Sequence, residues 1–168
     1  MDLLSIFEEI KKKLLKKGNI YFFSIIIIIF FLDRISKIKI INNFNENVYY
    51  LNDYINFDLI WNLGVGFGLL STSSSLFYNL VTVLIGMVIL FLSYFFIISE
   101  NIDKFIYSII IGGALGNFYD RMIYRAVPDY IDIHYGNFHW FTFNVADILI
   151  SLGIIIFLIK GLLESKIK

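Results

Sequence analysis

The feature that most constrains this chain is residues 76–98, a run of apolar and small residues without one charged side chain. About 20 consecutive apolar residues in a helix suffice to cross the hydrocarbon core of a bilayer. The rest of the chain is similarly apolar, because 58% of its 168 residues are hydrophobic and its mean hydropathy is +0.76. The sequence therefore predicts a polytopic membrane protein rather than a soluble domain.

We predict one membrane domain over residues 1–168, of the all-α class, with four membrane-spanning helices. The predicted spans cover about residues 20–40, 76–98, 105–121 and 145–163. The first span must include Asp33 and Lys37, which lie one turn apart and can pair, and its lysines are expected to extend outward to the interface. The third span contains small residues that let a neighbouring helix approach closely, namely Gly112, Gly113, Ala114 and Gly116.

The placement of lysine predicts the orientation. Residues 1–18 are rich in lysine and are predicted to form an amphipathic helix on the cytoplasmic membrane surface, with a solvated tail as the alternative. The connection over residues 42–75 contains no lysine or arginine, so we place it and residues 122–144 outside the cell. Both termini are then cytoplasmic.

The two outer connections resemble strands more than disordered loops. Residues 48–62 and 130–144 mix aromatic and β-branched side chains with partial alternation. The sequence Tyr135-Gly136-Asn137 is typical of a tight turn between two strands. We therefore expect a small extracytoplasmic antiparallel β-sheet at the outer ends of the helices.

The composition also excludes several kinds of site. The chain has no cysteine, which excludes disulfides, thiolate metal sites and a cysteine nucleophile. Its two histidines, His134 and His139, alternate with aromatic residues and are expected to be interfacial, so we predict no metal and no other cofactor. The net charge is zero and gives no sign of a nucleic-acid partner.

Two acidic residues stand at the outer mouths of neighbouring predicted spans. These are Asp129 and Asp147, with Asn144 one turn before the second. Two carboxylates held close together in low dielectric cannot both ionise. The ionised one can take a proton from water while the protonated one hydrogen-bonds a substrate carbonyl. This pair predicts peptide hydrolysis, with Asp132, expected on the same side of its strand as Asp129, as the alternative acid.

Other polar residues of the spans have supporting roles in this hypothesis. Asn117 and Asn144 could orient the carboxylates or bind substrate backbone, and Arg121 could counter surplus negative charge. We expect Asp120 to pair with Arg121 or to hold it on a carbonyl group. Asp33 is predicted to cap and orient the outer sheet through backbone amides.

Several sequence blocks, taken together, resemble bacterial lipoprotein signal peptidases (signal peptidase II, aspartyl protease family A8). They are DRISK at 33–37, NLGVGFG at 62–68, GNFYDR at 116–121, VPDYID at 127–132 and FNVAD at 143–147. The resemblance implies a four-helix fold with an outer β-cradle. It also implies an endopeptidase of the bacterial cell membrane that removes signal peptides from diacylglyceryl-modified prolipoproteins, cutting just before the lipidated cysteine.

The resemblance assigns roles by motif position. Asp129 and Asp147 match the catalytic pair, and Asp33 matches the acid of the first span. The remaining motif positions are Asn62, Gly64, Asn117, Asp120, Arg121 and Asn144. The partners that it implies are the prolipoprotein signal peptide and membrane lipid, and we expect a monomer because the site is complete within one chain.

The chain departs from the family pattern at a few positions, and none of these departures removes an acid or an asparagine from the predicted site. They are Arg34, Pro128, Phe141 and the pair Val65-Gly66. Pro128 either pre-organises the backbone before Asp129 or only ends a helix.

Two other functions compete with peptide hydrolysis. A small ion or proton carrier could use Asp33, Asp129 and Asp147 as relay groups. A relay needs carboxylates spread through the bilayer depth, whereas these cluster near one predicted boundary. A membrane adaptor that binds through its outer sheet would not require the acid at the start of the fourth span.

Overall fold

The computed structural model describes residues 8, 13, 18–44, 48–64 and 75–167. The predicted amphipathic segment therefore lies almost wholly outside the described residues, as does most of the NLGVGFG block. The described part contains four long helices and one four-stranded sheet. Their order is α2 (Asn19–Asn43), β1 (Tyr49–Asn52), β2 (Ile55–Asn62), α3 (Ser75–Ile98), α4 (Asn101–Tyr124), β3 (Val127–Tyr135), β4 (Phe138–Phe143) and α5 (Val145–Ile167).

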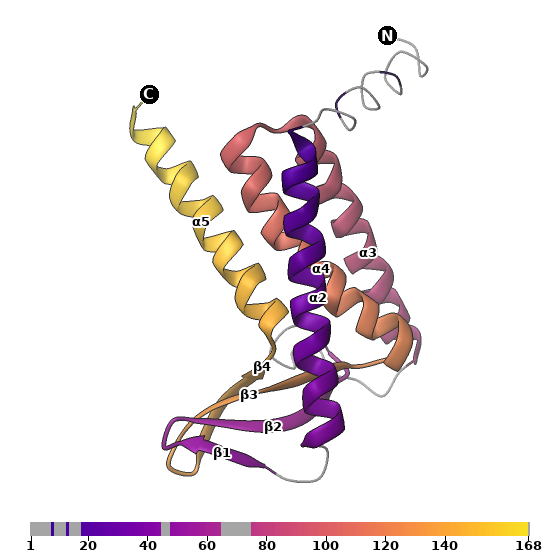
Figure 1. Ribbon diagram of the computed structural model, residues 1–168, viewed down its shortest axis with the longest axis vertical. Helices are drawn as coiled ribbons and strands as arrows, with labels where there is room; N and C mark the ends of the chain where they lie inside the picture. Colours follow the sequence, from indigo (N-terminus) through magenta and orange to yellow (C-terminus); the bar gives the residue numbers. More distant parts are fainter. Residues whose placement is uncertain (1–7, 9–12, 14–17, 45–47, 65–74, 168) are drawn as a thin grey trace.

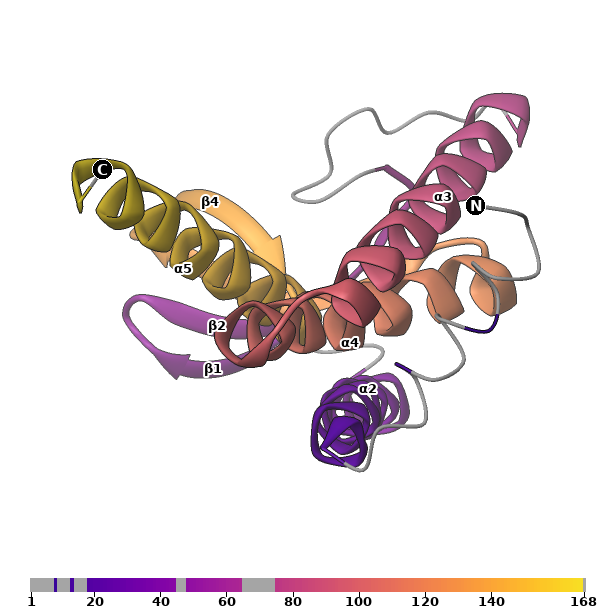
Figure 2. The same cartoon turned by 90° about the horizontal axis from the view of Figure 1, so that it is seen from above.

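Helix α4 is the central helix of the bundle, with α2, α3 and α5 each packed against it. Seen from above, α3 and α5 diverge on either side of α4 (Figure 2). Helix α2 begins and α5 ends at one end of the bundle, and the sheet lies at the opposite end (Figure 1). A helix covers each of the predicted spans, and the helix over the third extends beyond it at both ends.

Glycines make the close approach of the helices to α4 possible. A Cβ atom on Gly112 would lie 2.8 Å from the side chain of Ile29 on α2, and one on Gly113 would lie 2.9 Å from the carbonyl oxygen of Ala146 on α5. At Gly116 a Cβ atom would overlap a carboxylate oxygen of Asp33. The small residues of this helix therefore contact two neighbours, on two of its faces.

Two of the helices are long and apolar enough to cross a membrane, within the described part of the chain. They cover Leu76–Ile98 and Val145–Lys166. Large apolar side chains point away from the bundle, as Leu80 and Leu90 do on α3, where they are 64% and 72% exposed. Exposed apolar surface of this extent is typical of a membrane protein.

The sheet is antiparallel throughout, in the order β1-β2-β3-β4, and α3 and α4 lie between β2 and β3 in the sequence. Arg125 ends α4 in the left-handed conformation, with φ of 55°, and the chain turns directly into β3. Pro128 faces Trp61 of β2 where β4 has not yet joined the sheet, since β4 pairs with β3 only from Ile131 onward. A proline is tolerated there because β3 has only one neighbour at that point.

Candidate active site

Asn144 joins the two predicted catalytic acids. It stands directly before α5, and its side-chain oxygen accepts a hydrogen bond from the backbone N–H of Asp147 at 3.1 Å. A carboxylate oxygen of Asp147 accepts the backbone N–H of Asn144 in return, at 3.2 Å. This is a reciprocal capping box. The Nδ2 of Asn144 then donates to Asp129 at 2.6 Å, so both acids contact one asparagine.

Asp129 is almost fully buried, at 2% exposure, and both of its carboxylate oxygens accept hydrogen bonds. The second donor is the Nδ2 of Asn62 at the end of β2, at 2.8 Å. The side-chain oxygen of Asn62 accepts the backbone N–H of Gly64 at 2.8 Å, which fixes the orientation of its amide. The predicted positions Asn62 and Gly64 therefore act on Asp129 as one unit.

Asp147 receives its second hydrogen bond from Asn117 on α4. The Nδ2 of Asn117 donates to a carboxylate oxygen of Asp147 at 2.8 Å. The side-chain oxygen of Asn117 accepts from the ammonium of Lys37 at 2.7 Å. An ammonium can only donate, so Lys37 fixes which end of the Asn117 amide faces Asp147. The N-terminus of α5 and this donor both favour an ionised Asp147.

Lys37 is the centre of a buried charge network that joins α2 and α4. It is fully buried, and besides Asn117 its ammonium donates to Asp33 at 2.7 Å and to Asp120 at 2.8 Å. The other carboxylate oxygen of Asp120 accepts from Arg34. The expectation that Lys37 extends to the interface is therefore wrong, because three acceptors inside the bundle satisfy its three donors.

The network also corrects the expected roles of Asp33 and Asp120. Asp33 accepts the backbone N–H of Ala146 at 3.1 Å, so it orients the start of α5 and not the sheet. The ion pairs of Asp120 are with Lys37 and Arg34. Arg121 instead donates to the carbonyl oxygen of Gly64 at 2.6 Å. It thereby supports the same turn that orients Asn62.

Two participants in this site have no direct signature in the sequence. One is the backbone N–H of Ala146, which reaches Asp33 only because α5 packs against α2. The other is Arg34, one of the departures from the family pattern, whose charge offsets Asp120. The available signal was the spacing of Arg34 and Lys37, three residues apart on an apolar helix. Two such cations need an acidic partner on a neighbouring helix, and Asp120 is that partner.

Asp132 is not a second acid for this site. It lies three residues along β3 from Asp129, and side chains of a strand alternate between its faces. Its carboxylate instead binds His139 of β4 at 2.7 Å. The expectation that it shares a side with Asp129 is wrong for this reason.

Burial shifts the titration of Asp129. The pKa of its carboxyl is raised to about 7, first because burial disfavours the charged form and second because the negative charge of Asp147 lies nearby. Hydrogen bonds from Asn62 and Asn144 oppose the rise, as does the positive charge of Lys37. Asp129 can therefore hold a proton at neutral pH while Asp147 accepts one.

Comparison with known proteins decides which family the chain resembles. The sequence model of the family described as Signal peptidase (SPase) II matches residues 25–163. The chain belongs to the signal peptidase II family. A lipoprotein signal peptidase of Pelagibacter ubique is 42% identical over 142 residues, which cover 83% of this chain and 86% of the relative. One from Thermodesulfovibrio yellowstonii is 37% identical over 132 residues, covering 78% and 87%.

A solved structure has the same fold as this family member. It is described as a bacterial membrane enzyme determined by the in meso method at 2.3 Å resolution. It superposes with a TM-score of 0.75 at 26% sequence identity, and the match covers 88% of this chain and 91% of the other. The arrangement of helices and sheet described above is therefore shared with a membrane enzyme.

An open apolar groove lies beside Asp147. It has a volume of about 230 Å³ and is lined by Phe143, Asp147, Ile148, Ser151, Leu152 and Ile155. These residues run from Phe143, the last residue of β4, into the first three turns of α5. The carboxylate thus stands in the wall of a groove that suits an extended apolar ligand.

Proposed function

We propose that this chain is an aspartic endopeptidase that removes signal peptides from diacylglyceryl-modified prolipoproteins and cuts just before the lipidated cysteine. The catalytic residues are Asp129 and Asp147. The observation that carries the proposal is that Asn144 binds both acids, one through its Nδ2 and the other through a capping box. Membership of the signal peptidase II family supplies the substrate class.

The environments of the two acids assign their roles. Asp147, at a helix N-terminus and bonded to Asn117, takes a proton from a water molecule, and the resulting hydroxide attacks the scissile carbonyl carbon. Asp129 holds a proton near neutral pH and donates it to the carbonyl oxygen as the tetrahedral intermediate forms. When the C–N bond breaks, the proton on Asp147 passes to the leaving amine and Asp129 recovers its proton from the intermediate.

The supporting residues position these acids without touching the reacting atoms. Asn62, Gly64 and Arg121 hold Asp129 from the side of β2. Lys37, Asp33 and Asp120 form the structural polar network behind Asn117. Because all of these contacts lie within one chain, we propose that the enzyme acts as a monomer.

All four helices cross the membrane in this proposal, with both termini cytoplasmic and the sheet at the extracytoplasmic face. Four spans would return the chain to the side where it starts, which agrees with α2 beginning and α5 ending at the same end of the bundle (Figure 1). The charges of α2 and α4 do not prevent spanning, because Arg34 and Lys37 pair with Asp33 and Asp120 inside the bundle. The active site then lies near the outer membrane–water boundary.

The groove beside Asp147 receives the apolar part of the substrate. Ile148, Leu152 and Ile155 lie along one face of α5, which presents an apolar stripe next to the acid. A signal peptide or an acyl chain lying along this stripe would place the lipidated cysteine near Asp147.

A cleavage assay on the purified chain tests the proposal. The chain, in detergent with added phospholipid, is incubated with a prolipoprotein carrying a diacylglyceryl-cysteine and with the same precursor carrying serine at that position. We expect cleavage of the lipidated precursor alone, with the new N-terminus at the modified cysteine by mass spectrometry. Equal cleavage of both precursors, or cleavage of neither, would contradict the proposal that the lipidated precursor is the substrate.

The rate of cleavage is expected to fall as the pH rises through about 7. The carboxyl of Asp129 is protonated below its pKa of about 7 and loses the proton above it, so the general acid disappears at high pH. The decline should approach about tenfold per pH unit, as expected when one essential proton is lost. The two acids titrate as a pair, so the midpoint belongs to the pair.

The pH profile of kcat/KM on the lipidated precursor measures this fall in cleavage rate above about pH 7. The same raised pKa makes the folded state more stable below pH 3.8 than above pH 7, because folding then opposes ionisation of Asp129. The Asp129→Asn variant should lack that part of the pH dependence of stability. A rate that stays constant well above pH 7 contradicts Asp129 as the acid.

A further inference from the structure

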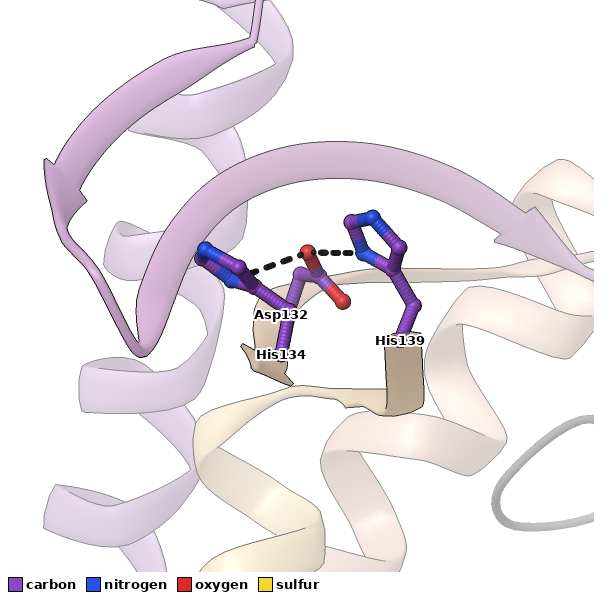
Figure 3. Close-up of side chains that lie close together, drawn as sticks. All are labelled: Asp132, His134 and His139. Atoms are coloured by element: carbon purple, nitrogen blue, oxygen red, sulfur yellow. Dashed lines mark hydrogen bonds and ion pairs between the residues drawn. The ribbon is translucent and has the colours of Figure 1, made fainter. Parts of the chain in front are cut away.

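A second cluster of polar side chains lies on the outer sheet, away from the peptidase site. It consists of Asp132 and His134 of β3 and His139 of β4, and each offers a ligand atom within 4.8 Å of the others. The carboxylate of Asp132 lies between the two imidazole rings (Figure 3). One of its oxygens lies 2.7 Å from the Nδ1 of His139 and 3.6 Å from the Nδ1 of His134.

An irregular register brings the three side chains to one face of the sheet. Asp132 and His134 are two residues apart on β3 and share a face. Ile133 faces Phe141, so a regular ladder would place Trp140 opposite His134 and would turn His139 to the other face. Instead the register shifts between Ile133 and His134, and His139 pairs with His134 directly. The imidazole rings then stack with centroids 5.3 Å apart.

Two residues next to Asp132, one on β3 and one on β2, have a buried side-chain atom without a hydrogen-bond partner. His134 is only 8% exposed, and its Nδ1 is buried without a hydrogen-bond partner although it faces Asp132. Asn56 of β2 stands opposite Asp132 in the ladder, and its side-chain oxygen is also buried without a partner. Buried polar atoms are costly when unpaired. A ligand held here would satisfy the His134 atom, and the register places Asn56 on the same face of the sheet.

The donor set matches a divalent transition metal. Zinc binds imidazole nitrogen and carboxylate oxygen at about 2.0–2.2 Å, so two ligands of a tetrahedral site lie about 3.4 Å apart. The separation of 3.6 Å between the His134 and Asp132 atoms is too long for a hydrogen bond and close to that value. The His139 atom, at 2.7 Å, would need to move outward by less than an ångström.

We propose that Asp132, His134 and His139 bind one Zn²⁺ ion, with the side-chain oxygen of Asn56 at or near the fourth position. The side chain of His139 is 58% exposed, which gives the ion a path from solvent. The ion would link β3 to β4 and, through Asn56, to β2. It would stabilise the outer sheet from a position outside the peptidase site. Folding therefore gives these histidines a setting that their positions in the sequence did not indicate.

Zinc binding to the chain of 168 residues tests the proposal, because few other side chains compete for the ion. The chain has no cysteine and no histidine besides His134 and His139, so a purification tag without histidine leaves no other thiolate or imidazole to compete for zinc. We expect equilibrium dialysis to give one zinc per chain, Co²⁺ to give the absorption of a tetrahedral site, and zinc to raise the Tm. Protein from which zinc has been removed with a chelator should still cleave the precursor, because the three side chains of the cluster are not part of the peptidase site.

Variants distinguish a built site from surface binding. His139→Ala removes an exposed ligand and is expected to weaken zinc binding by more than about 100-fold. The loss of a residue that only supports a ligand weakens metal binding by about 10–100-fold. Asp132→Asn should weaken zinc binding to a similar extent. Neither variant should show the absorption of a tetrahedral site when Co²⁺ is added. Asp58→Asn, which removes another acid of the sheet, is the matched control and should bind as the unmodified chain does. Zinc uptake that His139→Ala leaves unchanged, or no uptake by the unmodified chain, overturns the proposal.

Discussion

Replacing Asp129 or Asp147 with asparagine is expected to lower the cleavage rate of a lipidated precursor by at least about 10²–10⁴-fold, the contribution of a general acid or base. Asparagine keeps the size of the side chain, and its single oxygen can accept one of the two hydrogen bonds that each carboxylate accepts. It cannot hold the exchangeable proton that Asp129 donates, and it cannot take a proton from water as Asp147 does. The two acids act as a unit, so the double variant should lose little more than either single variant.

The measurement is single-turnover cleavage with a variant whose folding has been verified. Both variants should keep the helical content and elution volume of the unmodified chain. Asp58→Asn, on the same sheet, should retain the full rate. If both Asp129→Asn and Asp147→Asn still process the precursor, the assignment of the catalytic pair is wrong.

Replacing Lys37 with methionine is expected to destabilise the fold by about 3–5 kcal/mol, the usual cost of removing one partner from a buried ion pair. Lys37 is fully buried, and its loss leaves Asp33 without its only salt-bridge partner in the described part of the chain. Asp120 would keep Arg34. Methionine has a similar length, so the effect comes from charge and hydrogen bonding more than from packing.

Reversible unfolding in mixed detergent measures this change. Lys39→Met is the matched control, because Lys39 lies on the same helix with its side chain exposed, and it should change stability by less than about 0.5 kcal/mol. Adding Asp33→Asn to Lys37→Met should recover part of the loss, since it removes the unpaired charge. The folded fraction of Lys37→Met should also cleave more slowly, because the Asn117 amide is no longer held toward Asp147. A stability equal to that of Lys39→Met would contradict the role of the network.

The acids of the site were accessible from sequence because each has a local signature. Asn144 and Asp147 are three residues apart at the start of an apolar run, which is the spacing of a capping box. The outer strands were accessible too, since aromatic alternation and a glycine turn at Gly136 are local patterns. The pairing of Asp33 with Lys37, one turn apart on α2, was also predicted and is confirmed. What failed was the prediction of partners that lie far apart in the sequence. Asp33 contacts the start of α5, residue Ala146, and Asp120 contacts Arg34, and no local pattern joins positions so far apart.

Lys37 shows why such predictions fail. From its position near the end of an apolar run, a lysine is expected to extend toward water. That rule gives way when the bundle offers enough acceptors, and here Asp33, Asn117 and Asp120 supply one for each donor. His139 is a second case, since a shift of one residue in the ladder moves it to the face of Asp132.

The order of residues alone determined the apolar runs, the turns, the placement of lysine and the two acids at the start of their elements, because each depends on neighbours within a few positions. Only the packed molecule decided which amide faces which carboxylate, which charges neutralise one another and which histidine reaches which acid. Those choices follow from α4 lying between three helices and from the register of the sheet. Both arise from contacts between segments far apart along the chain, where short-range pattern carries no information.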